Sequence, residues 1–193
     1  MRAVVTFVLG GVFLAGAVLA AEPVAGDREA GRKMAGQCRT CHGIDGLAKI
    51  PIAPHIGGEP AGYIASQLTA FREGTREHEM MSVVAKMLND QQIADVAAWF
   101  SGHQATATLT TDAGGAPELC VGCHGADGIG LAEDVPNLAG ETTIYIDTQL
   151  KAFRSGKRTH EVMSAIAADL TDEDIRAAAE WYAGIKLEIQ QAD

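Results

Sequence analysis

The chain has 193 residues, 47% of them hydrophobic, and a formal net charge of −10 at pH 7. This length suits one medium domain or two small ones, and the acidic balance excludes nucleic acid as a partner. Aromatic residues make up only 5% of the chain, whereas glycine occurs 22 times. A core with so few large side chains suggests that a bound cofactor fills part of it.

The first 20 residues have the pattern of a secretory signal peptide. Arg2 precedes an almost wholly apolar run over residues 4–19, and small residues follow at Ala20 and Ala21, where cleavage is expected. The alternative is an uncleaved membrane anchor, but a run of about 16 residues is short for a membrane span. The mature chain is therefore predicted to reside in the periplasm, where unprotected cysteines oxidise.

The rest of the chain is an internal repeat. The hexapeptide Cys-Arg-Thr-Cys-His-Gly at residues 38–43 recurs as Cys-Val-Gly-Cys-His-Gly at residues 120–125, an offset of 82 residues. The same offset holds without a gap over the following sixty positions, and close to half of the aligned residues are identical. The pairs that it matches include Pro54 with Pro136, Glu59 with Glu141, Tyr63 with Tyr145, Gln67 with Gln149, and Trp99 with Trp181.

The repeat predicts two tandem domains, residues 22–102 and 118–193, with a linker at residues 103–117. The linker lacks helical periodicity and is rich in Thr, Ala and Gly. Charge is divided unevenly: residues 22–102 carry 8 basic and 10 acidic side chains, whereas residues 103–193 carry 6 and 15. The second half is therefore much the more acidic, which suits docking to a basic surface of a partner.

Within each copy the pattern is helical, in chain order. Asp27 can cap a short first helix that runs towards Cys38, and the next helix buries side chains at i, i+4 and i+7. The last helix of each copy opens with a capping box. No strand-like alternation of useful length is expected, so the fold class is all-α. The residues concerned are Ile64, Leu68 and Phe71 (Ile146, Leu150 and Phe153 in the second copy) and the boxes Asn89–Gln92 and Thr171–Asp174.

Three chemistries could use the repeated hexapeptide: zinc binding, a short-range disulfide, or covalent haem attachment. Zinc needs four ligands. Each copy offers only one pair of cysteines and one histidine, and the histidine is too close to the second cysteine for all three side chains to reach one ion. A disulfide leaves the histidine unexplained, and a redox Cys-x-x-Cys motif would need a βαβ context that is absent.

Covalent haem uses every residue of the motif. The two thiols of Cys-x-x-Cys-His form thioethers with the haem vinyl groups, and the adjacent histidine is the proximal ligand of the iron. The prediction is two covalently attached haem c groups, with the iron as the bound metal. The cysteines predicted to bind haem covalently are Cys38, Cys41, Cys120 and Cys123, and the histidines predicted to be proximal ligands of the iron are His42 and His124.

The distal ligand is predicted to be Met81 in the first copy and Met163 in the second, each 39 residues after its histidine. Met80 is adjacent to Met81, but its repeat partner is Val162, which cannot bind iron. His78 and His160 also match each other and could give bis-histidine ligation; a polar position near a haem propionate or solvent is favoured for them. The carbonyl groups of Pro54 and Pro136 are candidate acceptors for the proximal imidazoles.

These motifs resemble those of the dihaem cytochromes of the c4 type. The resemblance rests on Cys-x-x-Cys-His-Gly-x-Asp-Gly, Pro-Asn-Leu-Ala-Gly, Tyr-Ile-x-x-Gln-Leu-x-x-Phe-Arg-Ser-Gly-x-Arg and Met-Ser in tandem, and it covers essentially the whole mature chain. It implies two cytochrome c folds, each wrapped round a haem with His/Met ligation, with propionates facing each other across the domain interface. It also implies a periplasmic or membrane-associated electron carrier. The chain departs from the pattern at His55, where the second copy has Asn137.

The functional prediction is an electron carrier between a quinol-oxidising complex or a dehydrogenase and a terminal oxidase. The alternative is the electron-accepting cytochrome subunit of a sulfide, sulfite or alcohol dehydrogenase. With both irons six-coordinate, no substrate site and no enzymatic activity are expected. A basic cluster, Lys151, Arg154, Lys157 and Arg158, is interpreted as a solvated helix face. The alternative is that it rims an exposed haem edge, since it leads directly into the loop of Met163.

Overall fold

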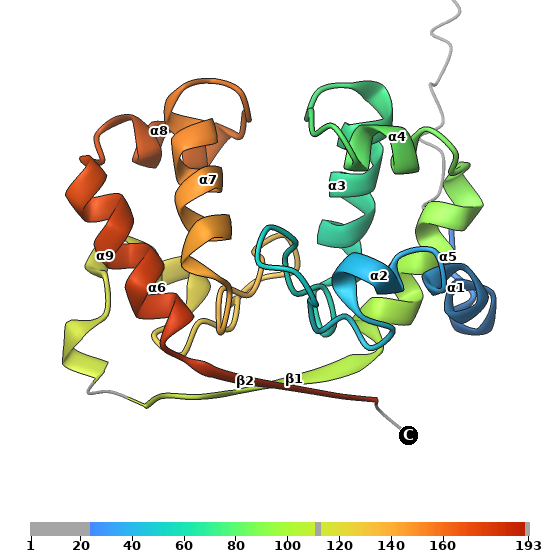
Figure 1. Ribbon diagram of the computed structural model, residues 1–193, viewed down its shortest axis with the longest axis horizontal. Coiled ribbons are helices and arrows are strands. Elements are labelled where there is room, and N and C mark those ends of the chain that lie inside the picture. The colour runs from blue at the N-terminus through green and yellow to red at the C-terminus, as the bar shows by residue number, and fades with distance from the viewer. Residues whose placement is uncertain (1–23, 111–112, 192–193) are drawn as a thin grey trace, which may run out of the picture.

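The computed structural model describes residues 24–110 and 113–191. The predicted signal peptide, residues 1–20, lies outside these described residues. Figure 1 shows two helical lobes side by side, with a two-stranded ribbon that runs beneath both of them. In the described part of the chain, no helix is both long and apolar enough to cross a membrane.

The first lobe contains five helices within the described residues. They are α1 (Arg28–Ala35), α2 (Arg39–His42), α3 (Ala61–Glu73), α4 (Met81–Ala85) and α5 (Asp90–Ser101). Asp27 caps α1 by accepting a hydrogen bond from the Ala30 N–H at 2.9 Å, and Asn89 and Gln92 form the predicted capping box of α5. The core is where the apolar periodicity places it, with Ile64, Leu68, Ile93, Val96 and Phe100 buried in one cluster.

The second lobe repeats this arrangement. A short 3-10 helix, η1 (Ala113–Gly115), leads into α6 (Glu118–His124), α7 (Thr143–Arg154), α8 (Glu161–Ala168) and α9 (Asp172–Ala183). Thr171 and Asp174 form the predicted capping box of α9. The buried cluster of this lobe contains Ile146, Leu150, Ile175, Ala179 and Tyr182. The protein is thus mostly helical, with the two tandem lobes that the repeat predicts.

The expectation that no strand forms is wrong. Strand β1 (His103–Thr108), which lies within the predicted linker, pairs antiparallel with β2 (Lys186–Gln191), and His103 is opposite Gln191. In both strands buried or half-buried side chains alternate with exposed ones. The sequence Lys-Leu-Glu-Ile-Gln at residues 186–190 contains this alternation, which is typical of a strand covering a core with one face. Because this alternating segment is so short and follows α9 directly, the sequence alone did not separate it from the end of that helix.

The ribbon joins the two lobes. On β1, Ala107 packs against the core cluster of the second lobe, as does Leu187 of β2. Further along β2, the side chain of Ile189 lies close against the backbone of Gly57 in the first lobe. The strand that leaves each lobe therefore packs on the other, so the ribbon holds the lobes together (Figure 1).

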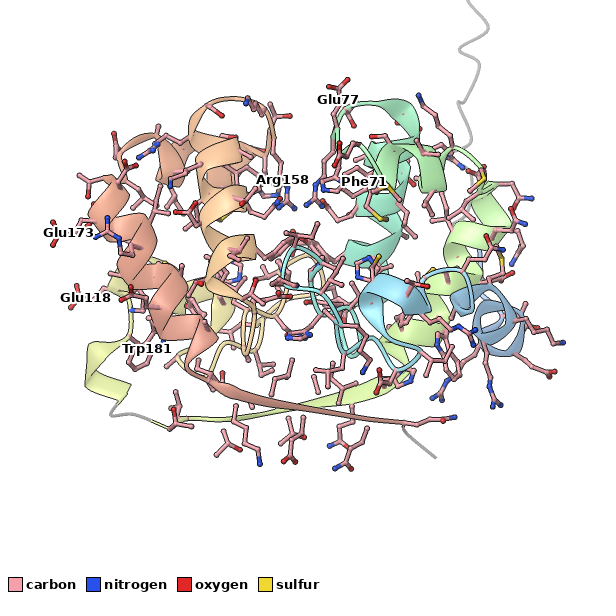
Figure 2. The ribbon with its side chains drawn as sticks, in the orientation of Figure 1. Phe71, Glu77, Glu118, Arg158, Glu173 and Trp181 are labelled. Atoms are coloured by element: carbon pink, nitrogen blue, oxygen red, sulfur yellow. The ribbon has the colours of Figure 1, made fainter. Side chains whose placement is uncertain are left out.

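A symmetric set of hydrogen bonds joins the turn after α3 to α7, and the turn after α7 to α3, across the interface. From the first lobe, Arg76 Nη2 donates to Gln149 Oε1 at 2.8 Å. From the second, Arg158 Nη2 donates to Gln67 Oε1 at 2.9 Å and to Tyr63 Oη at 3.1 Å. Figure 2 shows Arg158 between the two lobes. Its guanidinium therefore serves the interface, which corrects the interpretation of Arg158 as part of a solvated face.

Candidate haem sites

Each attachment motif lies on a single helical turn. Cys38 is the N-cap residue of α2, which contains Cys41 and His42, and α6 contains the equivalent residues of the second lobe. All four cysteines lie in the described part of the chain, and no disulfide joins any of them. The glycine after each histidine has a positive φ, 74° at Gly43 and 72° at Gly125, so the chain turns sharply as soon as the motif ends.

Both motif histidines are buried and held in one tautomer. His42 Nδ1 lies 2.9 Å from the carbonyl oxygen of Pro54, and His124 Nδ1 lies 2.9 Å from that of Pro136. The two proline carbonyls are confirmed as the partners of these rings. Since a carbonyl oxygen can only accept, each Nδ1 carries a proton and each Nε2 keeps a lone pair. Burial lowers the pKa of both histidines, which favours the neutral imidazole that iron binds.

Each candidate methionine packs on the same core as its motif. Cys38 and Met81 both contact the buried cluster of the first lobe, and Cys120 and Met163 contact that of the second. Met80, the neighbour of Met81, is 58% exposed. The packing therefore distinguishes Met81 from Met80 in the way that the repeat does.

The rival histidines accept hydrogen bonds from the backbone at the start of the helices that carry the methionines. His160 is the N-cap residue of α8, where its Nδ1 accepts from the Met163 N–H at 3.2 Å and its own N–H donates to Ser164 Oγ at 3.0 Å. In the first lobe His78 Nδ1 accepts from the Met81 N–H at 3.4 Å. Sequence analysis missed this role, although a polar residue three positions before each methionine was a signal for it.

The other chemistries of the motif find no support in the described residues. Within 24–110 and 113–191, no group of three or more His, Cys, Asp or Glu side chains could hold a metal ion. The residues instead fit covalent haem: two thiols on one turn, a neutral imidazole with a free Nε2, and a thioether on the same core. Trp181 Nε1 is buried without a hydrogen-bond partner in the described chain, whereas its equivalent, Trp99 Nε1, donates to the Ile44 carbonyl at 2.9 Å.

Comparisons with known proteins agree with this geometry. The family model described as "Cytochrome c" matches residues 28–104, and that described as "Cytochrome C oxidase, cbb3-type, subunit III" matches residues 116–181. Cytochrome c4 of Pseudomonas aeruginosa is 32% identical over 181 residues, which cover 83% of this chain and 90% of the relative. The chain belongs to the cytochrome c4 family. It accordingly carries two covalently attached haem c groups, one in each cytochrome c domain.

The chain is also similar to a thiosulfate dehydrogenase electron acceptor and to two solved structures. The thiosulfate dehydrogenase electron acceptor of Thiomonas intermedia is 31% identical over 175 residues, 79% of this chain and 80% of the relative. Among solved structures, reduced cytochrome c4 from Pseudomonas stutzeri has a TM-score of 0.74 at 29% identity and covers 84% of this chain and 100% of that one. Thiosulfate dehydrogenase from Marichromatium purpuratum has a TM-score of 0.72 at 32% identity, covering 83% of this chain but 40% of that one.

Sequence analysis noted Glu59 and Glu141 only as a matched pair, but this cytochrome c4 family member buries both of them at the domain interface. Their exposed fractions are 4% and 2%. The only sequence signal was the Gly-Glu dipeptide that the 82-residue offset preserves.

Proposed function

We propose that this chain is a dihaem electron carrier of the periplasm. One site consists of Cys38, Cys41, His42 and Met81. The other consists of Cys120, Cys123, His124 and Met163. The two cysteines of each site would hold the haem, and the histidine and methionine would ligate its iron. The observation that carries the proposal is the pairing of each buried histidine with a proline carbonyl, which leaves Nε2 free to ligate.

Bound haem supplies a one-electron couple at each site, and the residues of the chain set its properties. The proline carbonyls fix the histidine rings and raise their basicity as ligands. A thioether ligand together with histidine would raise the reduction potential. With both residues as ligands, the protein would store and pass electrons without a substrate site. We propose a quinol-oxidising complex or a dehydrogenase as the donor and a terminal oxidase as the acceptor.

A carbon monoxide titration tests the carrier role against an enzymatic one. The native ferrous protein should not bind carbon monoxide at either iron, whereas Met81→Ala should bind it at one. Rapid mixing of the reduced protein with oxidase-containing membranes should then oxidise both haems, and cyanide should block the reaction. Carbon monoxide binding by the native protein would instead indicate an open catalytic iron.

The alternative is an electron-accepting partner of a dehydrogenase, and the similarity to the thiosulfate dehydrogenase electron acceptor favours thiosulfate as the substrate of that enzyme. All four cysteines of the chain belong to the two attachment motifs, so none remains as a further ligand. Thiosulfate alone should therefore leave the ferric protein oxidised. Thiosulfate together with a purified thiosulfate dehydrogenase should reduce it if this alternative holds.

A further inference from the structure

Two hydrogen bonds connect His42 with a carboxyl group of the other domain. His42 Nδ1 lies 2.9 Å from the Pro54 carbonyl oxygen, and the His55 N–H donates to Glu141 Oε1 at 2.7 Å. The Pro54 carbonyl and the His55 N–H belong to one peptide group, which is planar and conjugated. A single peptide group therefore lies between the imidazole of the first domain and the carboxyl group of the second.

The second domain contains the same connection in the opposite direction. His124 Nδ1 lies 2.9 Å from the Pro136 carbonyl oxygen, and the Asn137 N–H donates to Glu59 Oε2 at 3.0 Å. Glu59 belongs to the first domain. We call each of these connections a cross-domain relay, since each buried carboxyl group reaches the motif histidine of the domain to which it does not belong.

Both carboxyl groups lie in surroundings that oppose ionisation. Desolvation by burial raises the pKa of Glu59 to about 8, against the opposing effect of the Asn137 N–H. Burial also raises the pKa of Glu141 well above its ordinary value, and the charge of Glu59 raises it further. Glu141 Oε2 has no hydrogen-bond partner within the described chain. A protonated carboxyl group suits this position better than an unpaired carboxylate oxygen.

The charged and titratable groups around the pair do not neutralise it. Arg76 and Arg158 donate to amide and phenol oxygens across the interface. Tyr63 Oη accepts one of these bonds, and burial raises the pKa of Tyr145 to about 12, so that phenol stays neutral. His55 has one ring nitrogen facing an N–H and the other facing a carbonyl, so it is neutral as well.

We propose that each buried carboxyl group is a proton-binding group linked to the redox state of the haem iron in the opposite domain. This rests on the proposed ligation by His42 and His124. A carboxylate that accepts the peptide N–H polarises the peptide group, and the carbonyl becomes a stronger acceptor for the imidazole N–H. The imidazole then becomes more electron-rich, which favours the ferric state. A protonated carboxyl group polarises the peptide less.

Thermodynamic linkage determines the sign of the coupling between ionisation of each carboxyl group and the redox state of the iron in the opposite domain. If ionised Glu141 favours ferric iron in the first domain, reduction of that iron must raise the proton affinity of Glu141. When the iron accepts one electron from the donor, Glu141 takes up a fraction of a proton from solvent. When the electron leaves for the acceptor, the same fraction returns to solvent. Glu59 does the same for the iron of the second domain.

The test uses Glu59→Gln and Glu141→Gln in the holoprotein, because glutamine has the shape of a protonated glutamate and each variant is the control for the other. The potential of each haem is followed through its own NMR methyl resonances from pH 5 to pH 9. At pH 9 Glu59→Gln should shift the second haem towards the ferrous state by about tenfold, or about 59 mV for one electron, and leave the first haem unchanged. Glu141→Gln should shift the first haem in the same direction and leave the second unchanged at any pH at which Glu141 is ionised. At pH 5, where wild-type carboxyl groups are protonated, neither variant should differ from wild type.

Two further measurements do not depend on reduction potentials, and the second of them needs no variant. In ferrous protein with ¹⁵N-labelled histidine, the Nδ1–H resonance of His42 should respond to Glu141→Gln and that of His124 to Glu59→Gln. Wild-type protein in weakly buffered solution with a pH indicator should take up protons on reduction near pH 8. Absence of uptake would overturn the proposal.

Other outcomes overturn the relay while leaving the proposed function intact. Equal shifts in the reduction potentials of both haems would indicate a general electrostatic field. A shift in the potential of the haem in the same domain as the substituted residue would contradict the cross-domain relay. A pH dependence that survives in the double variant would belong to the propionates. Failure of the proposed ligation by His42 or His124 would appear separately, as carbon monoxide binding by the native ferrous protein before any variant is made.

Discussion

His55 and Asn137 occupy equivalent positions in the two repeats and make the same two hydrogen bonds. His55 Nδ1 accepts from the Ala48 N–H at 2.9 Å, and its Nε2 faces the Gly140 carbonyl at 3.0 Å. Asn137 Oδ1 accepts from the Gly130 N–H at 3.0 Å, and its Nδ2 donates to the Gly58 carbonyl at 3.0 Å. The imidazole thus reproduces the acceptor and donor of a carboxamide, and in both cases the second bond crosses the domain interface.

His55→Asn should therefore fold and be less sensitive to acid than the wild type. Burial lowers the pKa of His55 below its ordinary value of 6.5, so its contribution to stability is present above pH 6.5 and is lost as the pH falls. Protonation would also remove the Nδ1 acceptor. Urea unfolding at pH 8 and pH 5 should show a smaller loss of unfolding free energy in the variant, by at most about 1.4 kcal/mol per pH unit.

The matched control for this prediction is Asn137→His, which should introduce acid sensitivity into the second domain. Equal pH dependence in the wild type and His55→Asn would show that the ring tolerates protonation in place.

The buried carboxyl pair should give the opposite pH dependence. The folded-state pKa of Glu59 is raised from 4.5 to about 8. Its contribution to stability is therefore complete below pH 4.5 and is lost as the pH rises through 8. The unfolding free energy of the wild type should fall between pH 6 and pH 9 more than that of the Glu59→Gln, Glu141→Gln double variant. Parallel curves would mean that the two carboxyl groups ionise normally in the folded protein.

Met81→Ala and Met163→Ala test the axial ligands. Each should abolish about half of the near-infrared sulfur-to-iron band of the ferric protein and lower the potential of one haem, because the thioether raises that potential. Met80→Ala is the control, since this side chain is 58% exposed and has Val162 as its repeat partner. Loss of the band in Met80→Ala with retention in Met81→Ala would reverse the assignment.

Arg76→Ala should uncouple the two domains. Arg76 donates to Gln149 of the other domain at 2.8 Å, and it also lies over the ring of Phe71 in its own. Loss of charge-assisted bonds should cost about 1.5–3 kcal/mol, mostly at the interface. We expect calorimetry to show one unfolding transition in the wild type and two in the variant.

Arg72→Ala is the matched control for Arg76→Ala. Arg72 pairs with Asp90 at 2.7 Å and with the Leu88 carbonyl at 3.3 Å, both within the first domain. Its loss should lower the transition temperature without splitting the transition. Identical calorimetric profiles for the two variants would contradict a special role for Arg76.

Electron transfer from the second domain to a basic partner should slow with salt, because the Debye length falls from about 10 Å at 0.1 M to about 3 Å at 1 M. Glu133 and Asp134 are exposed on the loop that precedes Pro136, so replacing both with lysine should flatten the salt dependence of stopped-flow rates. Replacing Glu173 and Glu118, which lie on the outer side of the second lobe, changes the charge equally (Figure 2). An equal effect of both pairs would show that only the net charge matters.

The sequence determined the repeat, the two attachment motifs and most of the helices, because these depend on neighbours along the chain. The Cys-x-x-Cys-His spacing places its groups on one turn wherever the turn lies, and the capping boxes of α5 and α9 act within four residues. The proline carbonyls could also be anticipated, since they follow the histidines by a short loop of 12 residues in both copies.

Only the tertiary structure decided how the two copies meet. The pairing of β1 with β2, the bonds of Arg76 and Arg158, and the burial of Glu59 and Glu141 all join residues about 70 to 90 positions apart. Periodicity cannot reveal such contacts, because a strand edge, a guanidinium or a carboxylate has the same local sequence whether it faces water or another domain. Burial then changes the chemistry: the same glutamate that would be a charged surface residue becomes, between two domains, a group that prefers its proton.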